Sequence, residues 1–142
     1  MRVLIDTNIL IDFIAMRRPF YPYALKIIDA CDRKLLHGCV AAHSIPNIYY
    51  ILRKEVSSQD RKDILKSLCQ ILTVEALGRE QITNALDDSG FSDFEDCLQC
   101  QCAAAFSADF IVTRNAEDFS ASPIPAISPE DFCAQFLNTE ER

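Results

Sequence analysis

The sequence has few of the features that nucleotide-binding and membrane-spanning proteins need. Its 142 residues include three glycines, and no Gly-Lys-Ser or Gly-Lys-Thr occurs, which excludes a phosphate-cradling nucleotide loop. No apolar run approaches the ~20 residues of a membrane span. The N-terminal residues lack the length and the small-residue cleavage site of a signal peptide. We therefore expect a cytoplasmic protein of one domain, long enough to bury a sizeable core.

Basic residues are also scarce, with 14 Lys and Arg against 21 Asp and Glu and a net charge of −7. A chain this acidic is a poor candidate for gripping a phosphate backbone. The charge is uneven, however, because residues 1–66 carry a net +4 and residues 67–142 a net −11. Two interpretations stay open: a basic flank beside an acidic site, or two solvated faces.

The seven cysteines are scattered mostly among apolar positions, which favours reduced, buried side chains that act as small hydrophobes. Cys97, Cys100 and Cys102 lie close together, and a zinc site is the alternative. No second Cys or His pair with zinc-finger spacing follows, and His37 and His43 lie far upstream. The buried role is therefore the better interpretation.

Short apolar runs alternate with amphipathic segments along the chain. The run Val3-Leu4-Ile5 suits a strand covered on both faces, and Thr7 or Asn8 can cap the helix that follows. Ser44 is expected to cap a later helix. We expect strands at 3–5, 39–42, 71–74, 110–113 and 126–127, and helices at 8–15, 23–34, 44–54, 60–69, 79–86, 94–105 and 128–137. This alternation predicts an α/β fold with a mostly parallel sheet covered on both faces.

Polar residues follow the first and fourth expected strands. Asp6 ends the first, and Asn115 and Asp118 follow the fourth. Carboxyl ends of parallel strands meet at one edge, which is where open α/β sheets bind ligands. The sequence therefore predicts that these side chains share a site. The alternative is that Asp6 is a loop acid or a helix cap.

A second acidic group stands at the start of the expected helix 94–105. Asp93 and Asp96 are three residues apart and share a face, whereas Glu95 is expected elsewhere on the helix, in solvent. Acids in a first helical turn are favoured by the helix dipole, so a capping role for Asp93 or Asp96 is the alternative.

Converging carboxylates repel one another, because each pair ~4 Å apart costs on the order of 4 kcal/mol near a protein surface. No Lys or His is placed to offset this, since His37 and His43 are expected to be satisfied or exposed. Mg²⁺ and Mn²⁺ prefer a few carboxylate oxygens and waters. Such an ion lowers the pKa of bound water and neutralises charge on a phosphoryl group. The acids therefore indicate phosphodiester chemistry.

These segments resemble a known family, the PIN domain. Residues 3–8 (Val-Leu-Ile-Asp-Thr-Asn) and 111–119 (Ile-Val-Thr-Arg-Asn-Ala-Glu-Asp-Phe) resemble its two ends. Between them, residues 93–96 (Asp-Phe-Glu-Asp), followed by the alanines 103–105, resemble its central acidic helix. The resemblance covers nearly the whole chain and keeps the order of the motifs.

The resemblance implies a three-layer α/β/α sandwich with a mostly parallel sheet, formed by one domain over residues 1–142 with a frayed tail at 138–142. Most PIN domains are Mg²⁺- or Mn²⁺-dependent ribonucleases. Many small bacterial members are VapC-type toxins that an antitoxin protein neutralises, and small PIN domains commonly pair. RNA, an antitoxin and a second copy of the chain are therefore the expected partners, and no membrane is.

Residue by residue, the resemblance assigns Asp6, Asp96 and Asp118 as metal ligands and catalytic acids. Asn115 joins them as a catalytic residue, and the expected supporting residues are Thr113, Asn8, Asp93 and Asn47. Candidates for the RNA backbone are basic residues of the first half, each of which can equally be solvated surface: Arg17, Arg18, Arg53 and Lys54. The expected partner surface draws on aromatic residues that a small core does not absorb: Tyr49, Tyr50, Phe20 and Tyr21.

One position departs from the family. The helix after the second strand usually supplies a Glu to the metals, and here Asn47 stands in its place. An amide can bind an ion through its carbonyl but supplies no charge, which argues against tight binding of a second metal.

The first functional interpretation is therefore a metal-dependent endoribonuclease, the toxin of a toxin–antitoxin pair, which leaves a 5′-phosphate by in-line attack of water. The alternative is an RNA- or protein-binding module with weak or lost catalysis. A third interpretation, Asp6 as a phospho-acceptor, ranks low because Asn8 cannot act as the general acid two residues later.

Overall fold

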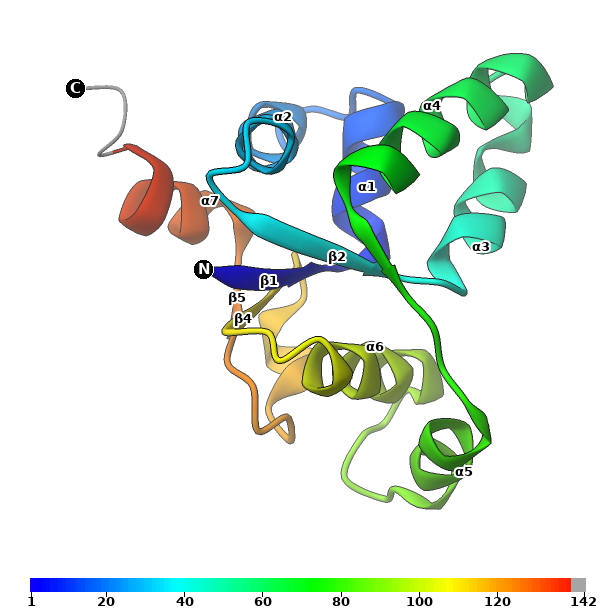
Figure 1. Cartoon of the computed structure of the whole chain (residues 1–142), viewed down its shortest axis with the longest axis vertical. Helices are drawn as coiled ribbons and strands as arrows, with labels where there is room; N and C mark the ends of the chain where they lie inside the picture. The colour runs from blue at the N-terminus through cyan, green and yellow to red at the C-terminus, as the bar shows by residue number, and fades with distance from the viewer. Residues whose placement is uncertain (139–142) are drawn as a thin grey trace.

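In the computed structural model, which describes residues 1–138, five parallel strands form one sheet in the order β3-β2-β1-β4-β5 (Figure 1). The strands are β1 (Arg2–Ile5), β2 (His37–Ala41), β3 (Thr73–Glu75), β4 (Phe110–Val112) and β5 (Ala126–Ile127). The predicted α/β class is confirmed. The predicted tail falls mostly on residues 139–142, which lie outside the described residues.

Helices cover both faces of the sheet. Above it in Figure 1 lie α1 (Thr7–Ile14), α2 (Tyr21–Asp32), α3 (Ser44–Ile51), α4 (Ser58–Ile71) and α7 (Pro129–Phe132). Below it lie α5 (Arg79–Asp87) and α6 (Phe94–Ala105). Short turns complete the chain: η1 (Leu52–Lys54), η2 (Ala116–Phe119) and η3 (Cys133–Leu137). The three expected layers are therefore present.

The apolar run of β1 fills both cores, because successive side chains of a strand point to opposite faces. Val3 and Ile5 pack under the upper helices, whereas Leu4 packs against α6 below, and all three are fully buried. Burial of one such side chain contributes ~1.5–3 kcal/mol. β1 is thus held in the middle of the sheet, and its carboxyl end, which Asp6 directly follows, is fixed in place.

Most predicted elements are found, with shifted ends. The predicted helices 60–69 and 23–34 are α4 and α2, and α4 runs through Ile71, so the third strand starts at Thr73 rather than at residue 71. The predicted helices 44–54 and 128–137 each change hydrogen-bond pattern partway along their length. The prediction of Ser44 as a cap was wrong, because its hydroxyl is buried against other side chains.

Six of the seven cysteines are buried as expected, and Cys69 is exposed. Within residues 1–138, no helix is long and apolar enough to cross a membrane.

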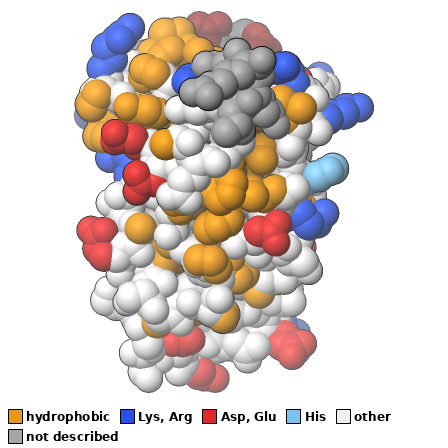
Figure 2. Space-filling view, turned by 90° about the vertical axis from the view of Figure 1, so that its left-hand side faces the viewer, with side chains coloured by type: hydrophobic (Ala, Val, Ile, Leu, Met, Phe, Trp, Pro, Cys, Tyr) orange, Lys and Arg blue, Asp and Glu red, His pale blue; other side chains and the backbone are white. Residues whose placement is uncertain are grey.

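The uneven charge of the sequence follows the layers. Residues 1–66 form most of the upper layer, and the lower layer comes from residues after position 66, including α5 and α6. Figure 2 shows Lys and Arg side chains mainly in the upper half of one face and mainly Asp and Glu in the lower half. The sheet therefore lies between a layer rich in basic residues and a layer rich in acidic residues.

Candidate active site

The site lies where the chain reverses its direction across the sheet. From β1 the strands run outward through β2 to β3, and the chain then returns to place β4 on the other side of β1. Ligands bind at such switch points, outside the carboxyl ends of the strands. Asp6 directly follows β1 and Thr113 directly follows β4, and their strands are neighbours.

Asp6 is held firmly at this point. Its side chain is 7% exposed and accepts hydrogen bonds from Thr113 Oγ1 at 2.7 Å and from the Thr7 backbone N–H at 2.7 Å. Asn8 Nδ2 lies 3.4 Å from its second oxygen. Asp6, rather than the predicted Thr7 or Asn8, is therefore the N-cap of α1, so the capping alternative is confirmed as a role of this side chain.

The acids of α6 and η2 lie near Asp6. α6 leads into β4, so its first turn lies at the carboxyl edge. Burial, together with the negative charges of Asp93, Asp6 and Asp118, raises the pKa of Asp96 to about 7. Burial also raises the pKa of Asp6, although the bonds from Thr113 and Thr7 act against this. The half-buried Asp96 carboxyl thus interacts electrostatically with the other acids of the cluster.

The other two acids of this turn have different roles, and the capping alternative is confirmed for Asp93. Asp93 is the N-cap of α6, since its Oδ1 accepts from the backbone N–H groups of Glu95 at 2.8 Å and Asp96 at 3.1 Å. Glu95 is exposed, as expected, although burial of part of its side chain and the charges of Asp6 and Asp93 raise its pKa. Glu95 Oε1 also lies 3.9 Å from His43 Nε2. Burial lowers the pKa of His43, so this ring is uncharged at neutral pH.

The remaining predicted residues lie at the rim. Asn115 and Asp118 are exposed, and the Asn115 backbone N–H donates to Thr113 Oγ1 at 3.1 Å. Asn47 is exposed on α3, one helical turn after the buried Ser44 and therefore on the same face. Thr113 thus links Asp6 to the η2 segment that carries Asp118.

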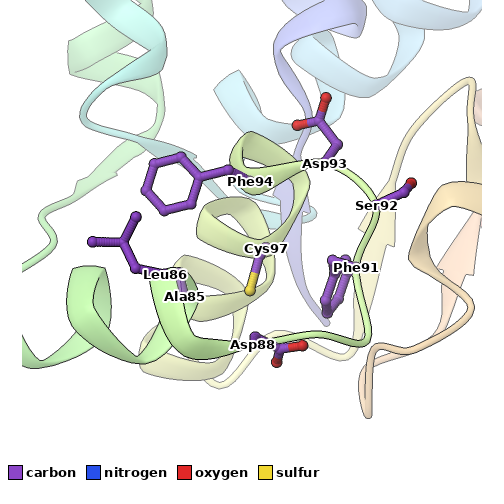
Figure 3. A pocket seen from close by; sticks show the side chains of 8 residues that line it. All are labelled: Ala85, Leu86, Asp88, Phe91, Ser92, Asp93, Phe94 and Cys97. Atoms are coloured by element: carbon purple, nitrogen blue, oxygen red, sulfur yellow. The ribbon is translucent and has the colours of Figure 1, made fainter.

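A hollow of about 230 Å³ adjoins the cluster between the end of α5 and the start of α6. Figure 3 shows the Asp93 carboxylate pointing out of it, while the Phe94 ring reaches toward Leu86 of α5. The floor of the hollow includes Cys97 and Asp88. Asp93 therefore borders both the cluster and this hollow.

The donor set fits a hard divalent cation. All the candidate ligands offer oxygen, as Mg²⁺ and Mn²⁺ prefer. Asn8 Oδ1, on a residue that contacts Asp6, is buried without a hydrogen-bond partner in residues 1–138. In that part of the chain, no three His, Cys, Asp or Glu side chains form a ready-made metal-binding group.

Sequence reasoning missed a buried amide that ties the site together. Gln99 of α6 is fully buried, and its Nε2 donates to Thr7 Oγ1 at 3.2 Å and to Ser44 Oγ at 3.0 Å. Gln99 is one turn from Asp96, and Thr7 adjoins Asp6. The only signal in the sequence was a polar residue three positions after Asp96, on the face that packs under the sheet.

We expect Gln99→Leu to destabilise the fold by about 1–3 kcal/mol, because the buried Thr7 and Ser44 hydroxyls lose a donor. Urea denaturation of the purified variant measures this. The matched control is Gln101→Leu, which changes a less buried residue of the same helix and should cost about 0.5 kcal/mol or less. Equal losses for both variants would show that the bonds of Gln99 contribute nothing.

The second missed residue is Arg114, directly after Thr113. Its guanidinium bonds Asp12, which is fully buried on α1. The positive charge of Arg114 acts to lower the pKa of Asp6. The expectation that no Lys or His offsets the acids did not consider Arg, and Arg114 acts on Asp6 in this way.

Comparisons with known proteins agree with this fold. A family model described as "PIN domain" matches residues 2–117. Ribonuclease VapC1 of Aquifex aeolicus (strain VF5) is 25% identical over 139 residues, which cover 95% of each chain. VapBC2 from Rickettsia felis, solved with a DNA fragment from its promoter, matches 90% of this chain and 98% of that chain, with a TM-score of 0.65 and 18% identity. FitAcB from Neisseria gonorrhoeae has the same coverage, a TM-score of 0.63 and 13% identity.

Proposed function

The chain belongs to the PIN-domain family, and from this we propose that it is a divalent-metal-dependent endoribonuclease, the toxin of a toxin–antitoxin pair. The observation that carries the proposal is the group of Asp6, Asp96 and Asp118, whose charges couple at the switch point of the sheet. The relative from Aquifex aeolicus is named a ribonuclease. We propose that the whole chain is one such domain and that it acts in the cytoplasm.

In this proposal Asp6, Asp96 and Asp118 hold Mg²⁺ or Mn²⁺, and Asn8 and Asn47 add neutral oxygens. The ion would supply an activated water and neutralise charge on the scissile phosphate. The chain's own residues do the positioning. Thr113 fixes the Asp6 carboxylate at 2.7 Å, and Asp93 fixes the first turn of α6. Asn115, at the rim, orients the substrate phosphate or a water.

The test is cleavage of a labelled single-stranded RNA by the purified protein, with Mg²⁺ or Mn²⁺ and with a chelator. We expect cleavage only with metal, 5′-phosphate ends on the products, and a rise in melting temperature with metal, since an ion that binds only the folded protein stabilises it. RNA binding without cleavage under all conditions would favour the binding-module alternative, which Asn47 supports because it supplies no charge.

We also propose that an antitoxin and a second copy of the chain cover the apolar side chains left in solvent. These lie on α3, α5 and the first turn of α6, on the right-hand side of Figure 1, and include Tyr50, Ile51, Ile82, Leu86 and Phe94. Tyr50 is 63% exposed, whereas Tyr49, Phe20 and Tyr21 are half-buried. Contiguous apolar surface marks interaction sites, and Phe94 lines one hollow with Ile82 and another with Leu86.

The raised pKa of Asp96 predicts an unusual pH dependence for the metal-free protein. With a pKa of about 7 against 3.8 for an ordinary Asp, folded Asp96 keeps a proton that the unfolded chain releases. Stability should therefore fall as the pH rises from about 4 to about 7. Metal affinity should rise over the upper part of that range, because the ion needs the deprotonated acid.

Urea midpoints between pH 5 and pH 8, measured with a chelator present, test this expectation. Asp96→Asn should flatten the pH dependence, whereas Asp63→Asn, at an exposed position of α4, should leave it unchanged. The same pH dependence in the Asp96→Asn variant and the wild type would contradict the assignment.

A further inference from the structure

The charge of Arg114 acts on Asp6, and its guanidinium is held at several points. Its Nε donates to Asp12 Oδ2 at 2.7 Å, and its Nη2 donates to Asp12 Oδ1 at 3.3 Å. The guanidinium carbon lies 4.2 Å from the ring centre of Phe20, a favourable cation–π distance. Such a two-point bond to a fully buried carboxylate, with a ring beneath, fixes the plane of the guanidinium.

The contacts with Asp12 and Phe20 leave part of the Arg114 guanidinium available. A guanidinium has five N–H groups, and the two bonds to Asp12 use two of them. No further hydrogen bond of Arg114 is found in the described part of the chain, and 28% of its side chain is exposed. The free edge therefore reaches solvent beside Thr113, the residue that holds Asp6.

The other basic candidates are farther from the acids or otherwise engaged. Arg17 pairs with Glu55 at 3.0 Å, and Arg53 stacks on Tyr50 with 3.9 Å to the ring centre. Burial raises the pKa of Asp12, whereas the charges of Arg114 and Arg17 act to lower it, so the two positive charges act on the same carboxyl. The edge thus has acids on α6 and η2, and two arginines act on the buried Asp12 of α1.

This arrangement addresses a difficulty of the proposed function, namely how a chain of net charge −7 binds a polyanion at an acidic site. On the basis of that proposed function, we propose that Arg114 binds a phosphate of the RNA backbone next to the phosphate that reacts. Asp12 and Phe20 hold its guanidinium in position for this contact. The fork of an Arg matches two phosphate oxygens, which a Lys does not.

The competing explanation is that Arg114 only neutralises Asp12 inside the fold. The two roles are separable, because a structural role affects everything that depends on folding, whereas a phosphate contact affects RNA alone. Removing Arg114 by itself would leave Asp12 as an unpaired buried charge. The test variant is therefore Asp12→Asn combined with Arg114→Gln, which keeps a neutral hydrogen-bonding pair at both positions.

The matched control is Arg33→Gln. Arg33 ends α2 at the other edge of the sheet and lies 3.6 Å from Asp29, and its side chain is 64% exposed. The Arg33→Gln substitution removes one positive charge from the upper layer, far from the acids. The wild type, the double variant and this control are then compared for RNA binding, Mn²⁺ binding and cleavage.

RNA binding is measured by fluorescence anisotropy of a short labelled RNA in chelator over a series of KCl concentrations. The double variant should bind about tenfold more weakly at low salt, and its slope of log K against log salt should be shallower by about 0.7, the value of one phosphate contact on a single strand. In the cleavage assay KM should rise about tenfold with kcat little changed, as for a contact made equally in ground and transition states. Mn²⁺ affinity by calorimetry should stay the same or rise.

An unchanged salt slope in the double variant would overturn the inference, as would a slope change equal to that of Arg33→Gln. Joint loss of RNA binding, Mn²⁺ binding and melting temperature would show a structural role only, and would also overturn it. In a further outcome, the salt slopes of the wild type and the double variant differ as expected, but the wild type never cleaves RNA. This would refute the ribonuclease proposal and leave the phosphate contact supported. A wild-type protein that binds no RNA would overturn this inference directly.

Discussion

Replacing Asp6 by asparagine should abolish metal-dependent RNA cleavage and leave the fold intact. The substitution removes one charge from the buried centre of the cluster, and such a charge ~4 Å from an ion contributes about 4 kcal/mol or more near a surface, which is about a thousandfold in affinity. The stabilisation by millimolar Mn²⁺ should disappear with it. Thermal melts with and without Mn²⁺, together with the cleavage assay, measure both effects.

The metal-free stability of Asp6→Asn should stay within about 1 kcal/mol of the wild type. Burial already disfavours the charged form of Asp6, and an asparagine oxygen can still accept from the Thr7 N–H. Asn8 Oδ1, without a partner among residues 1–138, can turn to accept from the new amide. Asp87→Asn, at an exposed position of α5, is the matched control for loss of one acid. Mn²⁺ stabilisation that survives in Asp6→Asn would place the metal elsewhere.

Asn47→Glu should raise the affinity for Mn²⁺ about tenfold or more, because it adds a charge near the surface, where such attractions reach a few kcal/mol. The side chain is exposed, so the new charge is not buried and the fold should tolerate it. Asn47 lies one turn after Ser44, which contacts Thr7 beside Asp6. Cleavage should rise as well if a second ion limits it, since two-metal sites share carboxylates.

Calorimetric titration with Mn²⁺ tests this, alongside a urea denaturation curve. The matched control is Gln70→Glu, which adds the same charge at an exposed position near the end of α4, before β3 and therefore at the opposite edge of the sheet. Unchanged affinity in a folded Asn47→Glu protein would mean that Asn47 does not face the acids and that the alignment of this helix with the family was wrong.

The sequence predicted the fold well where a pattern is local. The bounds 94–105 of α6 and 126–127 of β5 coincide with the structure, because apolar spacing and flanking polar residues mark them. Prediction failed where a side chain could hydrogen-bond either to the helix backbone or to other side chains. Thr7 and Ser44 looked like helix caps, yet their hydroxyls bond each other at 2.8 Å and both accept from Gln99. Leaving the buried Gln99 donor unpaired would cost more free energy than losing a helix cap, because water can replace the bonds of a cap.

The prediction of the site had the same limits. The resemblance to the PIN family, now supported by the match over residues 2–117, named Asp6, Asp96 and Asp118, and their roles stay predictions. The structure adds that burial, together with the charges of the neighbouring acids, raises the pKa of Asp96 to about 7. Burial and the charges of Asp6 and Asp93 also raise the pKa of the exposed Glu95, which helical spacing alone did not indicate.

The sequence by itself determined the order of strands and helices and the position of polar residues at strand ends, because each depends on side chains only a few residues apart. Tertiary structure alone decided which distant residues meet. Arg114 pairs with Asp12 across 102 positions, and Gln99 joins Thr7 across 92. Such pairs leave no periodic trace in the sequence, because only the packing of α1 and α6 against the two faces of one parallel sheet brings them together.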